Sequence, residues 1–243
     1  MYRSKNFYVR VTGDLALFTS PQSKAGGERT SYLVPTRQAL TGIVDGVYFK
    51  PSIQNIVTEV KVMNRIQTEV HGIRNLLKNG GSDLSYISYL HNVEYLVKFH
   101  FIWNKARPDL QQDWISKKHE AIMTRSLDKG GRLDLFLGAR ECYATATGIS
   151  ENEYKDSVSF YDEQEVDLGL MFHSFAYPIN EKDSLRSYFT TTRMINGIIK
   201  FKAQSECEVE NVLSAKGMGK RNGMKTVDEE FLEYEQWEKE EKY

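Results

Sequence analysis

Two lysines followed by a histidine, Lys117, Lys118 and His119, stand directly before the apolar positions of a predicted helix. A histidine can accept or donate a proton near neutral pH, because its unperturbed pKa is about 6.5. A neighbouring lysine ammonium can stabilise the negative charge that develops on a phosphorus atom under attack. The same three residues can equally form a solvated start of a helix, and spacing alone does not decide between these interpretations.

These residue types suit the scission of RNA by its own 2′-hydroxyl, which requires a base, an acid and a cation but no metal. The products would be a cyclic phosphate and a 5′-hydroxyl end. Arg125 lies further along the same predicted helix and adds a positive charge. The five histidines of the chain include no pair spaced four residues apart, which argues against a helical metal site. We therefore expect neither a metal nor a cofactor.

Tyr48 and two glycine-containing segments each allow a chemical and a structural interpretation. Tyr48 can be a phenol that transfers a proton or a hydrogen bond, or a core aromatic with its hydroxyl at the rim. The segments 130–132 and 138–140 can bring the backbone close to phosphates, with Arg132 and Arg140 as partners, or their glycines can end a helix and a strand. The signatures of P-loop nucleotide-binding proteins, serine hydrolases and zinc proteases are absent.

The composition is that of an ordinary folded protein. The chain has 243 residues, of which 40% are hydrophobic and 27% charged, and this length suffices to bury a substantial core. No run of about 18 apolar residues occurs, and the first residues lack the apolar stretch of a signal peptide. We therefore expect a cytoplasmic protein with no membrane contact. Cys142 and Cys207 lie far apart, which predicts free thiols and no disulfide framework or zinc site.

The charge is unevenly distributed along the chain. The formal net charge is −1, but residues 228–243 carry −6, which leaves +5 for the residues before them. A mildly positive body is compatible with a phosphate-binding surface. Residues 215–225 combine glycines with basic residues and predict a flexible basic linker, while the acidic segment after it predicts a helix or a disordered tail. Binding of duplex DNA by the basic linker is a weaker hypothesis.

Hydrophobic periodicity predicts the elements that must position these residues. Alternation predicts a first strand that ends at Gly13-Asp14, and helical spacing after Pro35 predicts a first helix. A hairpin is expected around His91-Asn92, with the odd-numbered residues of its second strand on one face. Gly130-Gly131 should end the second helix. The predicted elements are a strand over 7–12, a helix over 36–48, strands over 55–63, 85–90 and 93–103, a helix over 115–127 and a strand over 133–137.

This order, with a hairpin between two helices, matches the ferredoxin-like plan of RNA-recognition modules, although a fold does not by itself give a function. The later sequence is rich in predicted strands, and Asn196-Gly197 is its strongest hairpin signal. We therefore expect an α+β protein. It should comprise a ferredoxin-like domain with an inserted hairpin over 1–145, an antiparallel β subdomain over 146–214, and the linker and tail over 215–243.

Six segments, in order, resemble the CRISPR-associated family five, d-type, of subtype I-C systems over nearly the whole chain. They are GDLALFTSP (13–21), GGERTSYLVPTRQALTGI (26–43), VYFKP (47–51), KKHEAIMTRSL (117–127), KGGRLDLFLGAREC (129–142) and LGLMFHSFAYP (168–178). The resemblance implies a ferredoxin-like domain of the repeat-associated mysterious protein type, followed by an antiparallel sheet subdomain. It also implies metal-independent cleavage of precursor CRISPR RNA at the base of its repeat hairpin. The protein would then stay on the 5′ handle as a subunit of the interference complex.

The family's catalytic Tyr, Lys and His fall on Tyr48, Lys118 and His119, so the resemblance favours the chemical interpretation of all three. Two positions depart from the family pattern. Lys117 stands where relatives often carry a small residue, and Leu133 stands where they commonly show a second arginine. The alternative function is a structural subunit that grips the handle without cutting. We expect the following residues to contact RNA: Lys117, Arg125, Arg132, Arg140, Arg37 and Lys50.

Overall fold

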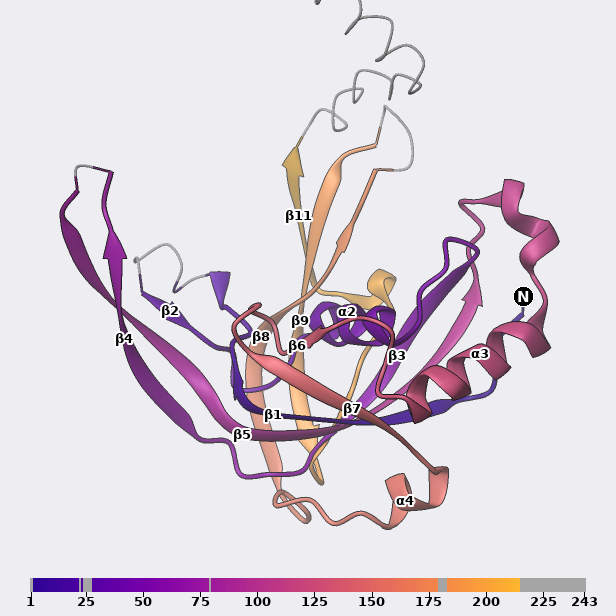
Figure 1. Cartoon of the computed structure of the whole chain (residues 1–243), viewed down its shortest axis with the longest axis horizontal. Helices are drawn as coiled ribbons and strands as arrows, with labels where there is room; N and C mark the ends of the chain where they lie inside the picture. Colours follow the sequence, from indigo (N-terminus) through magenta and orange to yellow (C-terminus); the bar gives the residue numbers. More distant parts are fainter. Residues whose placement is uncertain (1, 22, 24–27, 79, 179–182, 215–243) are drawn as a thin grey trace, which may run out of the picture. The chain divides into compact units, whose positions relative to one another are not determined.

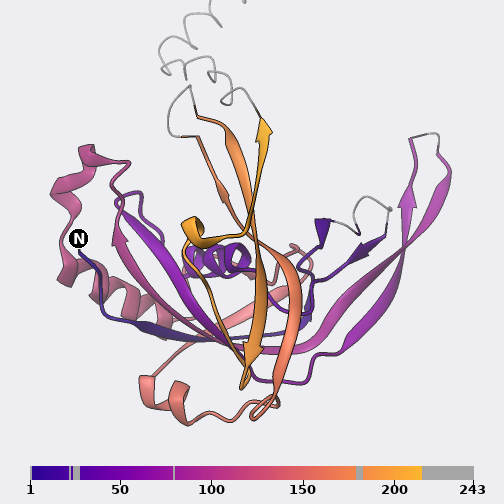
Figure 2. The ribbon, with the colours of Figure 1, turned by 180° about the vertical axis from the view of Figure 1, so that it is seen from behind.

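A 22-residue strand, β5 (Ser82–Trp103), runs through the largest sheet of the protein (Figure 1; seen from behind in Figure 2). Its second half pairs antiparallel with β1 (Phe7–Ala16) on one side and with β3 (Ile53–Val62) on the other. Strand β7 (Tyr143–Ile149) pairs antiparallel with the far side of β1, which gives the order β3-β5-β1-β7. Together with the helices, this sheet confirms the α+β class.

The computed structural model describes residues 2–21, 23, 28–78, 80–178 and 183–214. The chain divides into two compact units, the first comprising Met1–Ser174 and Tyr188–Glu210 and the second Phe175–Ser187 and Asn211–Tyr243. The division into three parts at residues 145 and 214 stays a prediction. The predicted basic linker and acidic tail lie outside the described residues.

The core lies on one face of this sheet. The predicted apolar face of β5 is confirmed, because Tyr95, Val97, Phe99 and Phe101 are buried in the main hydrophobic cluster. Helix α2 (Arg37–Val47) adds four buried residues at helical spacing, Leu40, Ile43, Val44 and Val47. Burial of this apolar stripe is the main stabilising contribution of such a helix. The helix follows Thr36, whose hydroxyl accepts a hydrogen bond from the backbone N–H of Ala39 at 3.2 Å.

The hairpin predicted at His91-Asn92 is wrong. Strand β5 passes through these residues without turning, and Asn92 only takes a positive φ of 48° within it. The first half of β5 pairs instead with β4 (Thr68–Leu76), so the real hairpin turns near residues 77–81. Asparagine tolerates a positive φ better than most residues, which is why it resembled a turn signal.

The first strand is also longer than predicted, because β1 continues through Gly13 to Ala16. A Cβ on Gly13 would collide with the side chain of Leu137 and lie 2.7 Å from the carbonyl oxygen of Tyr143. This glycine is therefore required by the close approach of a neighbouring segment and does not mark a turn.

The second helix was predicted correctly. It is α3 (Ser116–Asp128), and the positive φ angles of Gly130 and Gly131, 80° and 108°, end it as expected. The strand predicted over 133–137 shortens to β6 (Leu135–Phe136). Strand β7 was not predicted, because it is built from small residues and buries only Ala146. Helix α4 (Glu151–Asp156) was also missed.

The Asn196-Gly197 turn is confirmed. Both residues have a positive φ, 51° and 73°, and they join β9 (Leu185–Ile195) to β10 (Ile198–Lys200).

Cys142 is buried and Cys207 half-buried, and both thiols are free. Within the described parts of the chain, no helix has the length and apolar character needed to cross a membrane. The remaining elements are β2 (Arg29–Thr30), β8 (Glu165–Ala176), β11 (Val209–Ser214) and the short 3-10 helices η1 (Pro108–Asp113) and η2 (Gln204–Glu206).

Candidate active site

Tyr48 lies at the end of α2, where the chain changes from helix to extended backbone. Its φ and ψ are −158° and 118°, and its N–H still donates to the carbonyl of Val44 at 3.0 Å. The amide of Asn55 on β3 donates to the carbonyl of Tyr48 at 2.9 Å and to the carboxylate of Asp45 at 2.8 Å. The Tyr48 side chain is fully buried. Local geometry and the neighbouring strand thus hold this phenol in one place.

His119 lies in the first turn of α3 and on its buried face. It is fully buried, like Met123 four residues later, and Ser126 and Leu127 continue the same face one turn further on. Lys118, one position earlier, points to a different face and its side chain is 46% exposed. Adjacent positions on a helix differ in direction, so the sequence pair Lys-His becomes one exposed cation and one buried imidazole.

The phenol and the imidazole are joined by a hydrogen bond of 2.9 Å between Tyr48 Oη and His119 Nδ1. The other ring nitrogen, Nε2, lies 2.8 Å from the backbone carbonyl oxygen of Asp113. A carbonyl can only accept, so Nε2 carries a hydrogen. Burial raises the pKa of Tyr48, which keeps the phenol protonated at neutral pH. In the tautomer of His119 that carries its hydrogen on Nε2, Nδ1 accepts this hydrogen bond from the phenol, and the carbonyl of Asp113 favours that tautomer.

Asp113 is a functional candidate that the sequence did not indicate. Its Oδ1 accepts a hydrogen bond from the ammonium of Lys118, and its Oδ2 accepts one from the hydroxyl of Ser52 at 2.6 Å. The bond from Lys118, followed by that from Ser52, holds the pKa of this carboxyl below its usual range. No spacing signal points to Asp113, because it lies at the end of η1 and reaches Lys118 and His119 through a change of chain direction.

Aromatic rings form the wall around His119. The ring of Trp103 meets the imidazole edge-on at 5.7 Å between centroids, and Phe101 does so at 6.1 Å. Trp114 stacks on Trp103 at 5.9 Å with an interplanar angle of 1°. Trp103 had been predicted only as a residue of the apolar face of β5. These rings exclude water from the imidazole and leave Tyr48 and Asp113 as its polar contacts.

Arg132 is brought to the same place by the turn after α3. The N–H groups of Arg132 and Leu133 both donate to the carbonyl of Gly46 at 3.2 Å, which fixes this turn against the end of α2. The guanidinium lies 4.8 Å from the centre of the Tyr48 ring, and its Nε donates to Ser126 at 3.1 Å. A cation over a phenol ring is attracted by the ring face, and Arg132 counteracts in part the effect of burial on the pKa of Tyr48.

The other predicted RNA contacts are more dispersed. Lys117 and Arg125 are exposed on α3, Lys50 is exposed two residues after Tyr48, and Arg140 is exposed beyond β6. Within the described ranges none of these four cations has an ion pair. Arg37 is different: it is half-buried at the start of α2, the end opposite Tyr48, and its Nε donates to the carbonyl of Val57 at 3.2 Å. The structure does not bring Arg37 to the Tyr48 site.

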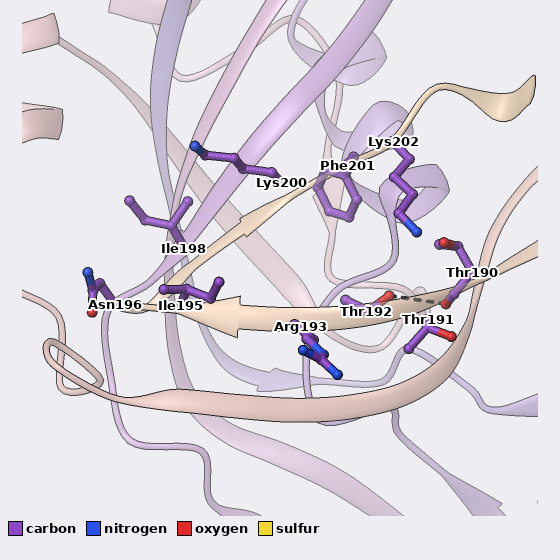
Figure 3. A pocket seen from close by; sticks show the side chains of 10 residues that line it. All are labelled: Thr190, Thr191, Thr192, Arg193, Ile195, Asn196, Ile198, Lys200, Phe201 and Lys202. Atoms are coloured by element: carbon purple, nitrogen blue, oxygen red, sulfur yellow. Dashed lines mark hydrogen bonds between the residues drawn. The ribbon is translucent and has the colours of Figure 1, made fainter. Parts of the chain in front are cut away.

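A separate hollow of about 550 Å³ lies between β9 and β10 (Figure 3). Threonines of β9 line it together with Arg193, Lys200 and Lys202. Two of these cations already face acids: Arg193 lies 3.6 Å from Glu165, and Lys202 lies 2.5 Å from Glu208. None of the predicted site residues lines it. In the described part of the chain no group of three or more His, Cys, Asp or Glu side chains is placed to hold a metal ion.

Comparison with known proteins gives consistent matches. The family model Cas5d, described as CRISPR-associated protein (Cas_Cas5), matches residues 8–202. A crystal structure of a CRISPR-associated protein has a TM-score of 0.77 and 56% sequence identity, covering 87% of this chain and 99% of that one. A functionally uncharacterized protein from Streptococcus mutans has the same TM-score with 57% identity, covering 87% of this chain and 100% of its own.

A curated relative from Mannheimia succiniciproducens, named CRISPR pre-crRNA endoribonuclease Cas5d, is 36% identical over 61 residues. This match covers 25% of this chain and 26% of the relative, so the alignment spans about a quarter of the relative's length.

Proposed function

The chain belongs to the Cas5d family of CRISPR-associated proteins, and we propose that it is a metal-independent endoribonuclease that cuts precursor CRISPR RNA at the base of its repeat hairpin. The observation that carries this proposal is the hydrogen bond of 2.9 Å between Tyr48 and His119, with the ammonium of Lys118 on the same helix start. The name of the curated relative, a pre-crRNA endoribonuclease, supports the substrate class.

In the proposed reaction, a 2′-oxygen of the RNA attacks the adjacent phosphorus and the bond from phosphorus to the 5′-oxygen breaks. The products are a 2′,3′-cyclic phosphate and a 5′-hydroxyl. Tyr48 positions or activates the 2′-hydroxyl, whose proton passes through the phenol to His119 along the hydrogen bond that joins the two side chains. The same proton then passes from His119 to the departing 5′-oxygen, which leaves as a hydroxyl. Lys118 supplies the positive charge that stabilises the phosphorane. No step requires a metal.

The burial of the pair sets a condition on this reaction. Tyr48 and His119 have no exposed surface, so RNA can reach the phenol only after a covering group moves. Arg132 is exposed and its guanidinium covers one face of the Tyr48 ring. We propose that a phosphate of the RNA draws this guanidinium away from the ring, because an arginine binds a phosphate more strongly than an aromatic face. Arg132 would then couple RNA binding to exposure of Tyr48.

The exposed cations Lys117, Arg125, Lys50 and Arg140 are proposed to contact the RNA backbone, since such contacts supply most of the salt-dependent affinity. Arg37 is also proposed to contact the RNA, but at a point away from the Tyr48 site. After cutting, the protein is proposed to stay on the 5′ handle as a subunit of the subtype I-C interference complex. Binding of duplex DNA through residues 216–225 is a weaker proposal about residues outside the described ones.

The order of the elements supports a ferredoxin-like plan for the first part of the chain. Strands β3, β5, β1 and β7 lie in this order and are antiparallel, while α2 follows β1 and α3 follows β5. This is the connectivity of a split βαβ motif repeated once. Tyr48 directly follows the last residue of α2, whereas His119 lies in the first turn of α3, so the C-terminal end of one helix and the N-terminal end of the other supply the pair.

The test of the proposed activity is incubation of repeat hairpin RNA with the protein in EDTA. We expect cutting with a cyclic phosphate product, and we expect Lys118→Ala to lower the single-turnover rate constant about 100-fold or more. Lys117→Ala is the matched control, because it removes the same charge one position earlier, from a side chain that makes no ion pair with Asp113, whereas Lys118 does. An uncut hairpin, or equal rates for Lys118→Ala and wild type, would contradict the proposal.

The second candidate is a subunit that grips the handle without cutting. Two observations favour it: the full burial of Tyr48 and His119, and the ion pair that occupies Lys118. Binding of repeat hairpin RNA at nanomolar protein with no product after long incubation would identify this function. Tight binding together with cleavage would exclude this second function.

A further inference from the structure

The two segments that carry the proposed catalytic groups are joined at one side chain, Asp113. One segment is the connection from α2 to β3, which contains Tyr48 and, four residues later, Ser52. The other is the start of α3, which contains Lys118 and His119. Asp113 contacts both segments. Its carboxylate accepts hydrogen bonds from Ser52 and Lys118 and lies 3.4 Å from Nε2 of His119, and its backbone carbonyl accepts from the same Nε2.

We infer that Asp113 is a positioning residue for RNA cleavage, which holds the ammonium of Lys118 next to the Tyr48–His119 pair; this inference rests on the proposed function. A lysine side chain is long and flexible, and without a partner its ammonium samples many positions. The carboxylate restricts it to one side of the site, and Ser52 in turn fixes the carboxylate at 2.6 Å. Ser52 is itself buried, so this support is rigid.

The backbone carbonyl of Asp113 has a separate effect, because it fixes the hydrogen on Nε2 of His119 and leaves Nδ1 for Tyr48. A substitution of the side chain keeps this carbonyl in place. The variant Asp113→Asn therefore removes the charge that holds Lys118 but retains the tautomer of His119. It also retains an oxygen that can accept from Ser52, so the lost charge acts on Lys118 and, across 3.4 Å, on Nε2 of His119.

The experiment measures single-turnover cleavage of a 5′-labelled synthetic repeat hairpin RNA together with its affinity. We expect Asp113→Asn to lower the rate constant about 10- to 100-fold, since a displacement of about 1 Å costs on this order. RNA affinity should be unchanged or higher, because a negative charge has been removed. The matched control is Asp109→Asn, on the same 3-10 helix, where the carboxylate forms an exposed ion pair with Arg107 at 2.7 Å.

A double-mutant cycle separates positioning from a general structural role. If Asp113 acts through Lys118, Asp113→Asn should have no further effect on the rate in a Lys118→Ala background. Multiplied losses in the double variant would overturn the inference, and so would a wild-type or faster rate for Asp113→Asn. If Asp113→Asn does not fold, Ser52→Ala replaces it and should lower the rate about fivefold by loosening the carboxylate.

Wild-type protein that leaves the RNA uncut would refute the proposed function and this role with it. Wild-type cleavage matched by Asp113→Asn would refute the role of Asp113 alone.

Discussion

Replacement of Tyr48 by phenylalanine tests the hydrogen bond at the centre of the site with a change of a single oxygen atom. The ring stays in place, but His119 Nδ1 loses its partner at 2.9 Å in a fully buried position. A lost hydrogen bond contributes about 1 kcal/mol, and a buried acceptor left without a partner costs about 1–3 kcal/mol. We therefore expect Tyr48→Phe to lower the free energy of unfolding by about 2 kcal/mol.

For a chain of this length such a loss lowers the Tm by about 4–8 °C. A protein of ordinary stability, about 5–15 kcal/mol, would still be almost entirely folded at 25 °C. Any loss of cleavage at that temperature is therefore a property of the folded variant. If Tyr48 takes part in proton transfer, we expect the single-turnover rate constant to fall about 100-fold or more.

The assay combines thermal unfolding followed by circular dichroism with single-turnover cleavage of the repeat hairpin RNA. Tyr143→Phe is the matched control, because Tyr143 is 68% exposed and the loss of its hydroxyl should change neither quantity. An unchanged Tm for Tyr48→Phe would refute the buried hydrogen bond. A lowered Tm with a wild-type rate would show that the bond is structural and that the phenol has no part in cleavage.

Three further predictions concern the fold. Gly138 has a φ of 87°, and a Cβ there would lie 2.7 Å from the backbone carbon of Leu17, so Gly138→Ala should lower the free energy of unfolding by more than about 2 kcal/mol in urea titrations. Gly42 lies within α2 with open space around its Cβ position, so Gly42→Ala should instead raise it by about 0.5–1 kcal/mol; a loss would show that the space is filled. Burial, followed by the charges of Arg3 and Arg37, lowers the pKa of His100 to about 4. The unfolded chain therefore takes up a proton below about pH 6.5, whereas the folded protein takes it up only near pH 4. The free energy of unfolding should therefore fall as the pH is lowered through this window. The free energy of unfolding of the His100→Gln variant should fall less between pH 7 and pH 5 than that of the wild type. An identical dependence of this free energy on pH in the two proteins would contradict the assignment.

The elements with a strong periodic pattern were predictable from the sequence. Helix α2 and the buried face of β5 follow from regularly spaced large apolar residues, and the end of α3 follows from two glycines. Strand β7 was not predictable, because its alanines and threonines give no contrast in hydrophobicity between its two faces. Gly13 and Asn92 were misleading for a related reason. Each has a local conformation or contact that resembles a turn, and only the neighbouring strand reveals that the chain continues.

The candidate site was predictable only in part. Lys118 and His119 are adjacent in the sequence, so their chemistry was open to local reasoning, whereas the link from His119 to Tyr48 spans 71 residues and depends on the tertiary fold. Asp113 had no pattern at all, since its contacts come from the geometry of η1. Sequence reasoning also grouped Arg37 with the RNA contacts, but the structure places it at the far end of α2.

The length of β5 has a consequence for how the chain folds. Its first half can pair early with β4, a neighbour in the sequence, whereas the pairing of its second half with β1 joins residues about 80 positions apart. Pairings between distant residues slow folding into the range of milliseconds to seconds. During that interval the apolar face that carries Tyr95, Phe99 and Phe101 is exposed next to an already formed ribbon. Such an intermediate is prone to aggregation, so the yield of folded protein should depend more on chain concentration and temperature than its final stability suggests.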